Sequence, residues 1–352
     1  MKRRKKTILV LYSVLLAAFS VYFLLDTFVI ERVYSAEAPA AVSQSAAEES
    51  QASGQSGAEE SAANTLSSVG TSGKDAANTA NDDLSSGVQS EETAGYLKAV
   101  QAQTGPSEPV ITENSYNDGN ISITITEYRQ HDTTIYAADI QLSSADCLKT
   151  ALAKGAYGRN VTAKTSATAA ANEAILAVNG DYYGSQERGY VIRGGVIYRS
   201  TAASGRQDLV IYQDGSMEVI LESDISAEEL LAKGARDVLS FGPELLKDGE
   251  IAVNSSYEVA KATNSNPRTA IGMIDELHYI FVVSDGRTSE SAGLSVYELA
   301  EFMKSLGAKT AYNLDGGGSS TMYFNGEVIN DPVGGGRGQS ERSVSDIVYI
   351  GY

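Results

Sequence analysis

The chain is poor in the residues on which several common types of site depend. Its 352 residues include one cysteine, two histidines and no tryptophan. The single cysteine, Cys147, excludes an intramolecular disulfide, and with only two histidines a Cys/His zinc site is effectively excluded. His278 lies in an alternating strand-like sequence and His131 in a polar turn, so the sequence argues against a Ser-His-Asp triad.

Basic residues are also scarce. There are 27 Lys and Arg against 45 Asp and Glu, which gives a formal net charge of −18. The first 35 residues are basic, so the rest of the chain carries the excess of acid. Phosphate backbones are bound by basic surfaces, and we therefore expect no nucleic-acid partner.

The N-terminus has the pattern of a membrane-targeting segment. Residues 2–6 are all Lys or Arg, and residues 7–25 are uncharged, close to the roughly 20 residues that span a bilayer. Ala36-Glu37-Ala38 resembles a signal-peptidase site, yet the uncharged run exceeds the usual signal core, which favours a retained anchor. Residues 1–35 are therefore predicted to be a signal anchor or signal peptide, in a single-pass membrane protein whose C-terminal domain is extracellular, or secreted if cleaved.

The composition changes twice along the chain. Residues 36–110 are rich in Ser, Ala and Glu with few large apolar side chains, which predicts a disordered linker. Residues 111–352 are assigned to one domain. Turn signals such as Gly194-Gly195, and capping boxes that begin at Ser226 and Ser295, separate many short strands from a few helices. This pattern predicts an α+β fold with a mixed, mostly antiparallel sheet and helices packed on it.

Two short apolar strands end in the same Asn-x-Asp pattern. The first, residues 174–178, runs into Asn179 and Asp181, and the second, residues 311–314, contains Asn313 and precedes Asp315. If the strands are neighbours, two carboxylates meet across one cleft. Turns are the commonest use of these residue types, but the matched pair favours a site.

An anion-binding sequence follows the second aspartate. It consists of three glycines and three hydroxyl residues, namely Gly316, Gly317, Gly318, Ser319, Ser320 and Thr321. Glycines permit the backbone conformations in which successive N–H groups hold phosphate oxygens. Arg268, at the start of a strand that precedes this run in the sequence, is either a phosphate ligand or a surface ion-pair partner.

These motifs together resemble the phosphodiester glycosidase family, which includes the enzyme that uncovers mannose 6-phosphate and bacterial exopolysaccharide-associated proteins. The similarity covers about residues 165–352. Its ordered motifs are Asn179-Gly180-Asp181-Tyr182-Tyr183, Arg268-Thr269-Ala270-Ile271-Gly272, Val283-Ser284-Asp285-Gly286-Arg287, the Asn313–Thr321 run and Arg342-Ser343-Val344-Ser345. The resemblance implies hydrolysis of the bond between a sugar's anomeric carbon and a phosphodiester oxygen, on a GlcNAc-1-phosphodiester-like carbohydrate, without a cofactor.

Roles for the candidates follow from the needs of this reaction, which passes through an oxocarbenium-like state. We expect Asp315 and Asp181 to form the catalytic carboxylate pair, with Asp315 as base or nucleophile. Phosphate would be held by Arg268, by the amides of Gly316, Gly317 and Gly318, and by Ser319 and Ser320. Asn179 and Asn313 are expected either to orient the aspartates or to bind sugar hydroxyls. The further substrate-binding candidates are Thr321, Glu244, Asp285 and Arg342.

Two rival functions remain open at this point. In the first, Asp181, Asp315 and asparagine carbonyls bind Mg²⁺ or Ca²⁺ in a metal-dependent phosphodiesterase that breaks the P–O bond. In the second, the domain binds cell-wall glycans without catalysis, using some of its 20 tyrosines as stacking platforms.

Overall fold

The computed structural model describes residues 2–36, 108–254, 264–334 and 340–352. The side chains of residues 2–11 and of Phe28 lie outside this description, as does nearly all of the predicted linker. All of the described residues belong to one compact unit. Helix α1 spans Lys2–Phe28. In the described part of the chain, no helix is both long and apolar enough to cross a membrane.

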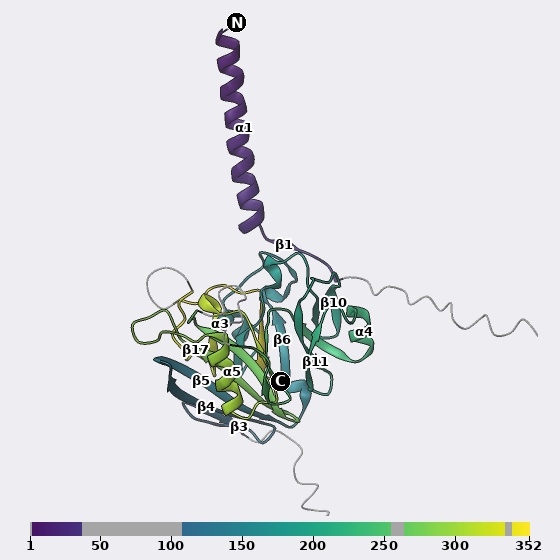
Figure 1. Ribbon diagram of the computed structural model, residues 1–352, viewed down its shortest axis with the longest axis vertical. Helices are drawn as coiled ribbons and strands as arrows, with labels where there is room; N and C mark the ends of the chain where they lie inside the picture. The colour runs from purple at the N-terminus through teal and green to yellow at the C-terminus, as the bar shows by residue number, and fades with distance from the viewer. Residues whose placement is uncertain (1, 37–107, 255–263, 335–339) are drawn as a thin grey trace, which may run out of the picture. The chain divides into compact units, whose positions relative to one another are not determined.

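A nine-stranded antiparallel sheet forms the central layer of the fold (Figure 1). Its strands, in spatial order, are β15 (Glu250–Ile251), β14 (Glu244–Lys247), β18 (Thr310–Asn313), β16 (Arg268–Asp275), β17 (His278–Ser284), β5 (Thr133–Leu142), β4 (Ile121–Gln130), β3 (Ser115–Asn117) and β2 (Val110–Ile111). Helix α5 (Val296–Ser305) packs on one face through Leu299 and Phe302, which join residues of β5, β16, β17 and β18 in one apolar cluster.

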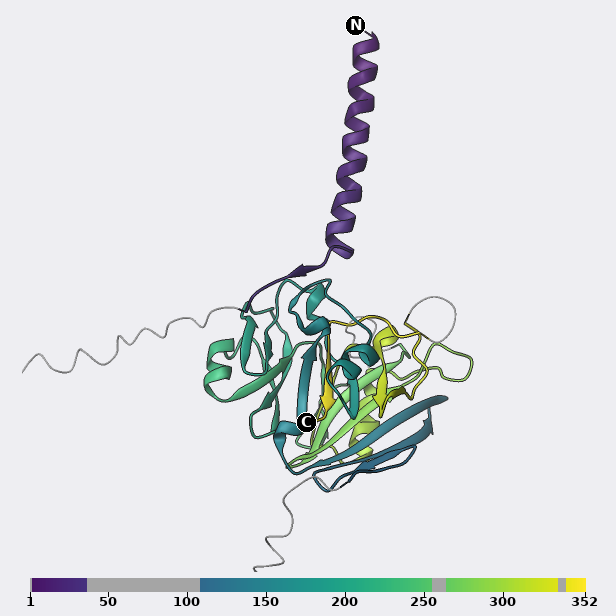
Figure 2. The ribbon, with the colours of Figure 1, turned by 180° about the vertical axis from the view of Figure 1, so that it is seen from behind.

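Two five-stranded sheets contribute to the core on the other face, and Figure 2 shows the same strands from behind. One contains β20 (Glu327–Val328), β19 (Met322–Phe324), β8 (Leu176–Asn179), β21 (Asp346–Ile350) and β6 (Leu148–Leu152); the other contains β10 (Val196–Arg199), β9 (Val191–Arg193), β13 (Ala235–Leu239), β11 (Gln207–Tyr212) and β12 (Met217–Leu221). Two short helices, α3 (Thr165–Ala171) and α4 (Ala227–Ala232), pack against the first and second of these sheets. A separate two-stranded sheet joins β1 (Arg32–Val33) to β7 (Gly158–Arg159).

The predicted antiparallel architecture is confirmed, while the number of sheets is larger than expected. All pairs of these strands are antiparallel, but they form three larger sheets instead of one, and the helices of the domain are short. The capping boxes at Ser226 and Ser295 are both present. Gly194 and Gly195 turn the β9–β10 hairpin with φ angles of 57° and 75°, in the left-handed region where glycine is least strained.

Candidate active site

The two Asn-x-Asp motifs meet at one cavity of about 540 Å³. It is lined by Thr162, Asp181, Tyr182, Ser185, Phe241, Asn266, Arg268, Arg287, Asp315, Gly316, Gly317 and Arg342–Ser345. Two aspartates and three arginines from distant parts of the sequence therefore border the same space. The predicted convergence of Asp181 and Asp315 on one cleft is present in the structure.

The strands that precede these aspartates are not neighbours in a sheet, so the two carboxylates converge without the strand pairing that the sequence analysis named as a condition. β8 belongs to a five-stranded sheet and β18 to the nine-stranded sheet, and their ends meet through loop contacts. The Asp315 amide donates to the Gly180 carbonyl at 3.2 Å. Asn179 Nδ2 donates to the Asp315 carbonyl at 2.6 Å. The first motif therefore fixes the backbone of the second.

Asn179 and Asn313 are scaffold residues in this structure, since neither lines the cavity. Asn179 Oδ1 accepts a hydrogen bond from Thr269 Oγ1 at 2.8 Å, so both ends of its amide are engaged. Asn313 Nδ2 donates to the Gly242 carbonyl at 2.8 Å. Of the two roles expected for these asparagines, the position of Asn179 favours orientation of the Asp315 segment over contact with sugar hydroxyls.

Asp315 presents a partly accessible carboxylate to the cavity. Its side chain is 16% exposed. Oδ2 accepts hydrogen bonds from Ser319 Oγ and from Arg342 Nη2, each at 2.7 Å. Arg342 Nε also donates to Ser319 Oγ at 2.8 Å. The guanidinium and the hydroxyl thus hold one carboxylate oxygen from two sides and fix the carboxyl plane.

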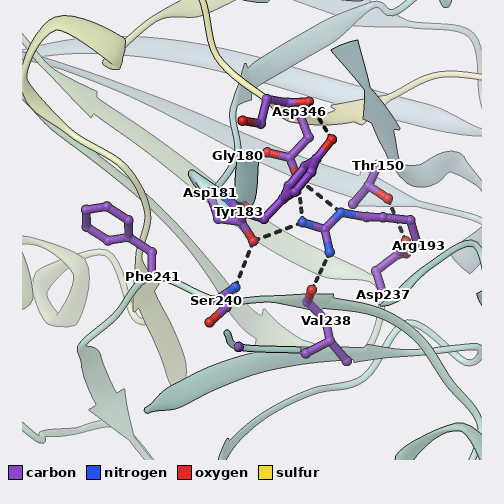
Figure 3. A network of polar contacts seen from close by, with 12 residues as sticks. Thr150, Gly180, Asp181, Tyr183, Arg193, Asp237, Val238, Ser240, Phe241 and Asp346 are labelled. Atoms are coloured by element: carbon purple, nitrogen blue, oxygen red, sulfur yellow. Dashed lines mark hydrogen bonds and ion pairs between the residues drawn. The ribbon is translucent and has the colours of Figure 1, made fainter. Parts of the chain in front are cut away.

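Asp181 has a different environment, which Figure 3 shows. Its side chain is fully buried. Oδ1 accepts from the Tyr183 amide at 2.8 Å, and Oδ2 accepts from Arg193 Nη2 and the Ser240 amide, each at 2.9 Å. Three N–H donors therefore satisfy this carboxylate, which favours a positioning role over direct attack on a substrate.

Arg193 and Asp346 complete the buried network and were missed by the sequence reasoning. Arg193 Nε donates to Asp346 Oδ2 at 3.0 Å, and its Nη1 donates to the Ile192 and Val238 carbonyls. Burial, and next the charge of Asp181, raise the pKa of Asp346 to about 7, against the opposing effect of Arg193. One arginine thus serves two buried carboxylates. The sequence signal for Arg193 and Asp346 was weak, because each is simply a charged residue at one end of an apolar strand.

Gly180 is required by this network. A Cβ atom at this position would lie 2.4 Å from Asp346 Oδ1, inside van der Waals contact. The glycine in the first motif therefore allows a buried carboxylate to approach the backbone between Asn179 and Asp181.

Two further arginines line the cavity and are held by neighbouring oxygens. Arg268 is buried, and its Nε and Nη2 donate to the Leu294 and Asn264 carbonyls at 2.8 and 2.9 Å. Arg287, which was not among the candidates, donates from Nε and Nη2 to Asn266 Oδ1 at 3.0 and 2.8 Å. Arg287 is exposed, so its position at the cavity is compatible with an anionic ligand.

The glycine run forms a tight turn in which one of the three predicted phosphate-binding amides, that of Gly317, is already engaged. The Gly317 amide donates to the Pro267 carbonyl at 2.8 Å, and the Ser319 and Ser320 amides donate back to Gly316 and Gly317. A Cβ at Gly317, where φ is 62°, would lie 2.9 Å from Arg287 Nη2, so glycine admits this guanidinium. The run therefore allows the Arg287 guanidinium to lie close to the backbone at Gly317.

The remaining residues of the run face away from the cavity. Gly318 packs on Gly334, where a Cβ would meet the Gly334 Cα at 2.8 Å. The hydroxyls of Ser320 and Thr321 are buried and have no hydrogen-bond partner in the described residues. Of the three hydroxyl residues, only Ser319 contacts a cavity group.

Two predicted substrate-binding carboxylates lie elsewhere. Glu244 lines a separate cavity with Gln207 and Lys247, and burial raises the pKa of its carboxyl. Asp285 is buried and accepts hydrogen bonds from Asn330 Nδ2 and the Asp331 amide at 3.1 and 2.8 Å. Neither reaches the Asp315 cavity in this structure. Within the described ranges, no three His, Cys, Asp or Glu side chains converge as a metal site.

Comparison with known proteins identifies the family. The phosphodiester glycosidase profile matches residues 172–351, just over half of the chain. The chain belongs to the phosphodiester glycosidase family. The resemblance predicted from the motif series is therefore confirmed, and the matched segment contains every cavity residue named above except Thr162.

Several relatives of this phosphodiester glycosidase are similar over only part of their length. The SPbeta prophage-derived uncharacterized protein YomE of Bacillus subtilis is 32% identical over 183 residues, covering 51% of this chain and 28% of that protein. Mouse N-acetylglucosamine-1-phosphodiester alpha-N-acetylglucosaminidase is 31% identical over 158 residues, covering 41% and 30%. The chain thus spans about a third or less of these relatives.

A solved structure shares the fold of this phosphodiester glycosidase. It is the zebrafish N-acetylglucosamine-1-phosphodiester alpha-N-acetylglucosaminidase catalytic domain, described as auto-inhibited by its pro-peptide. The TM-score is 0.53 at 21% identity, covering 71% of this chain and 87% of the zebrafish chain. At this identity the similarity concerns the fold alone.

Proposed function

We propose that the chain hydrolyses a sugar-1-phosphate diester, of the GlcNAc-1-phosphodiester type, in a cell-surface or extracellular polysaccharide. The observation that carries the proposal is the accessible carboxylate of Asp315, held by Ser319 and Arg342 in a cavity that two more arginines border. The family and the names of its mammalian relatives support the reaction type. The export of the chain is inferred from the sequence of the N-terminal segment alone. Alkaline extraction of membranes tests whether the chain is anchored in a membrane.

The groups in the cavity match the charges that develop during cleavage of the C–O bond. A phosphate monoester leaves with its negative charge, and Arg342 and Arg287 lie at the cavity to receive it. The anomeric carbon becomes positive, and Asp315 is the carboxylate able to approach it as nucleophile or as base for water. Asp181 is a positioning residue, because its two oxygens hold the Tyr183 and Ser240 segments.

Hydrolysis in ¹⁸O-labelled water tests which bond breaks. A GlcNAc-1-phosphodiester with a simple alkyl group on phosphate is the substrate, and mass spectrometry of both products is the measurement. We expect the label in the free sugar, because water attacks the anomeric carbon. Label in the phosphate product indicates a phosphodiesterase and overturns the proposal, and binding without release of sugar indicates a glycan-binding module.

Asp315→Asn tests the residue that carries the reaction. The substitution keeps the size of the side chain and removes its charge, so we expect kcat to fall by about 10³-fold or more while the protein remains folded. Asp146→Asn, on an exposed turn, is the matched control and should leave kcat unchanged. Near-normal turnover by the Asp315 variant discards this assignment.

A further inference from the structure

The segment that follows helix α1 lies on the domain as an added strand. In the pairing of β1 with β7, Arg32 is opposite Arg159 and Val33 is opposite Gly158. The Tyr34 amide continues the ladder by donating to the Tyr157 carbonyl at 2.9 Å. Main-chain pairing of this kind holds two extended segments together without requiring a particular side-chain sequence.

The residues just before the strand also contact the domain. Asn160 Nδ2 donates to the Thr27 and Ile30 carbonyls at 3.2 and 3.1 Å. Lys154 forms an ion pair with Glu31. Asn160 itself has a φ of 59°, a left-handed conformation that asparagine tolerates better than most residues.

Strand β7 allows the N-terminal segment to approach its backbone closely. A Cβ at Gly158 would lie 2.0 Å from the Arg32 carbonyl oxygen and 2.8 Å from Val161 Cγ2. No side chain larger than hydrogen fits there while the strand is in place. Gly158 is therefore required at the point where the N-terminal segment crosses the domain.

A stack of aromatic rings connects the strand to the buried network of the active site. The Tyr34 ring centroid lies 6.0 Å from that of Tyr157, which stacks on Tyr183 at 5.2 Å. The Arg193 guanidinium lies 5.8 Å from the Tyr183 ring centroid, as Figure 3 shows. Tyr183 also donates its amide to Asp181. The contacts thus run from Tyr34 to both partners of the central ion pair.

The strand lies behind the wall of the catalytic cavity and not inside it. Tyr34 and Tyr157 line a second cavity of about 240 Å³, which also includes Tyr183, Gly184 and Gln186. The catalytic cavity takes Tyr182 and Ser185 from the same turn, and the two cavities share no lining residue. The turn at residues 182–186 is therefore the wall between them.

We propose that residues 31–34 are a built-in strand of the catalytic domain that supports, within one chain, the turn next to Asp181. Processing at Ala36-Glu37-Ala38 would separate this strand from the domain and lower turnover. The position of the strand is independent of the proposed reaction, whereas the effect on turnover rests on the proposed function.

Disulfide trapping in the full-length protein tests the position of the strand. Residues 32 and 159 are directly opposed, at a Cα separation of about 4.5–5.5 Å in an antiparallel pair, within the range a disulfide accepts. The native Cys147 is buried and should not compete. We expect Arg32→Cys/Arg159→Cys to form a cross-link within one chain under mild oxidation, seen by peptide mass mapping.

The control pair is Arg32→Cys/Val110→Cys, since Val110 is exposed on β2, the outermost strand of the nine-stranded sheet. More cross-linking in the Arg32/Arg159 pair than in the control supports the proposal. A cross-link found only between two chains, or cross-linking no greater than in the control, overturns it.

Kinetics test the support of the active site. Tyr34→Ala removes the ring that packs on Tyr157 and should lower kcat about tenfold with little change in KM, because the Asp181 turn is held less firmly. Tyr12→Ala, at an exposed position of α1, is the matched control and should match the unmodified protein. Equal kcat for the two variants overturns the supporting role of the strand. If the unmodified protein shows no turnover, the proposed function is rejected, and the cross-linking result still tests the position of the strand.

Discussion

The arginines at the site differ in what they hold, and this decides how substitutions at each should act. Arg342 contacts Asp315 Oδ2, Ser319 Oγ and the Gly316 carbonyl from a side chain that is 46% exposed. Among the described residues, Arg193 donates only to buried groups. The first is placed to act on substrate and the second to hold the scaffold.

Replacement of Arg342 should damage catalysis more than folding. Arg342→Ala removes a cation from the cavity and frees the Asp315 carboxylate, so kcat/KM should fall by about 10²-fold. Arg342→Lys should recover only part of this loss, because an ammonium group lacks the guanidinium fork that reaches both Asp315 and Ser319. Steady-state kinetics on the small phosphodiester, with the exposed Arg129→Ala as control, measure both effects. An alanine variant within twofold of the unmodified protein contradicts the assigned role.

Replacement of Arg193 should instead destabilise the fold. Arg193→Gln leaves Asp181 and Asp346 buried without their shared cation, at a cost of about 3–5 kcal/mol in the free energy of unfolding. Lys309→Gln breaks an exposed ion pair with Asp275 and should change the free energy of unfolding far less, because solvent screens the pair. Urea unfolding of both variants gives the comparison. Equal destabilisation by the two substitutions would show that the buried network is not specially stabilising.

At the scale of elements, features encoded by adjacent residues were predictable. The hairpin of β9 and β10 follows from Gly194-Gly195, and α5 begins at the Ser295 capping box, because turn and cap preferences act over two to four residues. The assignment of β8 and β18 to different sheets was not predictable. Their contact joins segments 136 residues apart through the Asn179 side chain and a bond from the Asp315 amide to the Gly180 carbonyl, and no local pattern specifies such a pairing.

The cap of α5 gives a test of how far local signals contribute to stability. Ser295 Oγ accepts from the Glu298 amide, and the Glu298 side chain accepts from the Ser295 amide at 2.8 Å. Ser295→Ala should lower the free energy of unfolding by about 1 kcal/mol, measured by urea titration. Ser289→Ala, at an exposed position outside the helix, should change it by less than about 0.5 kcal/mol. A Ser295 variant as stable as the Ser289 control would show that packing alone holds α5.

At the scale of the whole molecule, the sequence indicated the cavity but not the interior that supports it. Asp315 and Asp181 were found because each follows a strand in a repeated motif. Arg193 and Asp346 lie 153 residues apart, and either charge taken alone is as consistent with the surface as with the core. Only the folded chain shows that Asp346 approaches Gly180 and shares Arg193 with Asp181.

This buried network should make the stability of the molecule depend on pH in a defined window. Burial, then Asp181, raise the pKa of Asp346 from the ordinary 3.8 to about 7, so between these values the folded state holds a proton that the unfolded state has lost. The free energy of unfolding should therefore fall as pH rises from about 4 to 7, by at most about 1.4 kcal/mol per pH unit, and then level off. The Asp346→Asn variant has no carboxyl group at this position but keeps all the other carboxylates of the chain. The contributions of those other groups to the pH dependence of stability therefore largely cancel in the difference between the two proteins. Urea unfolding of both at pH 5, 6, 7 and 8 measures this difference, and a difference that is constant or grows with pH would mean that Asp346 is already ionised in the folded state at pH 5.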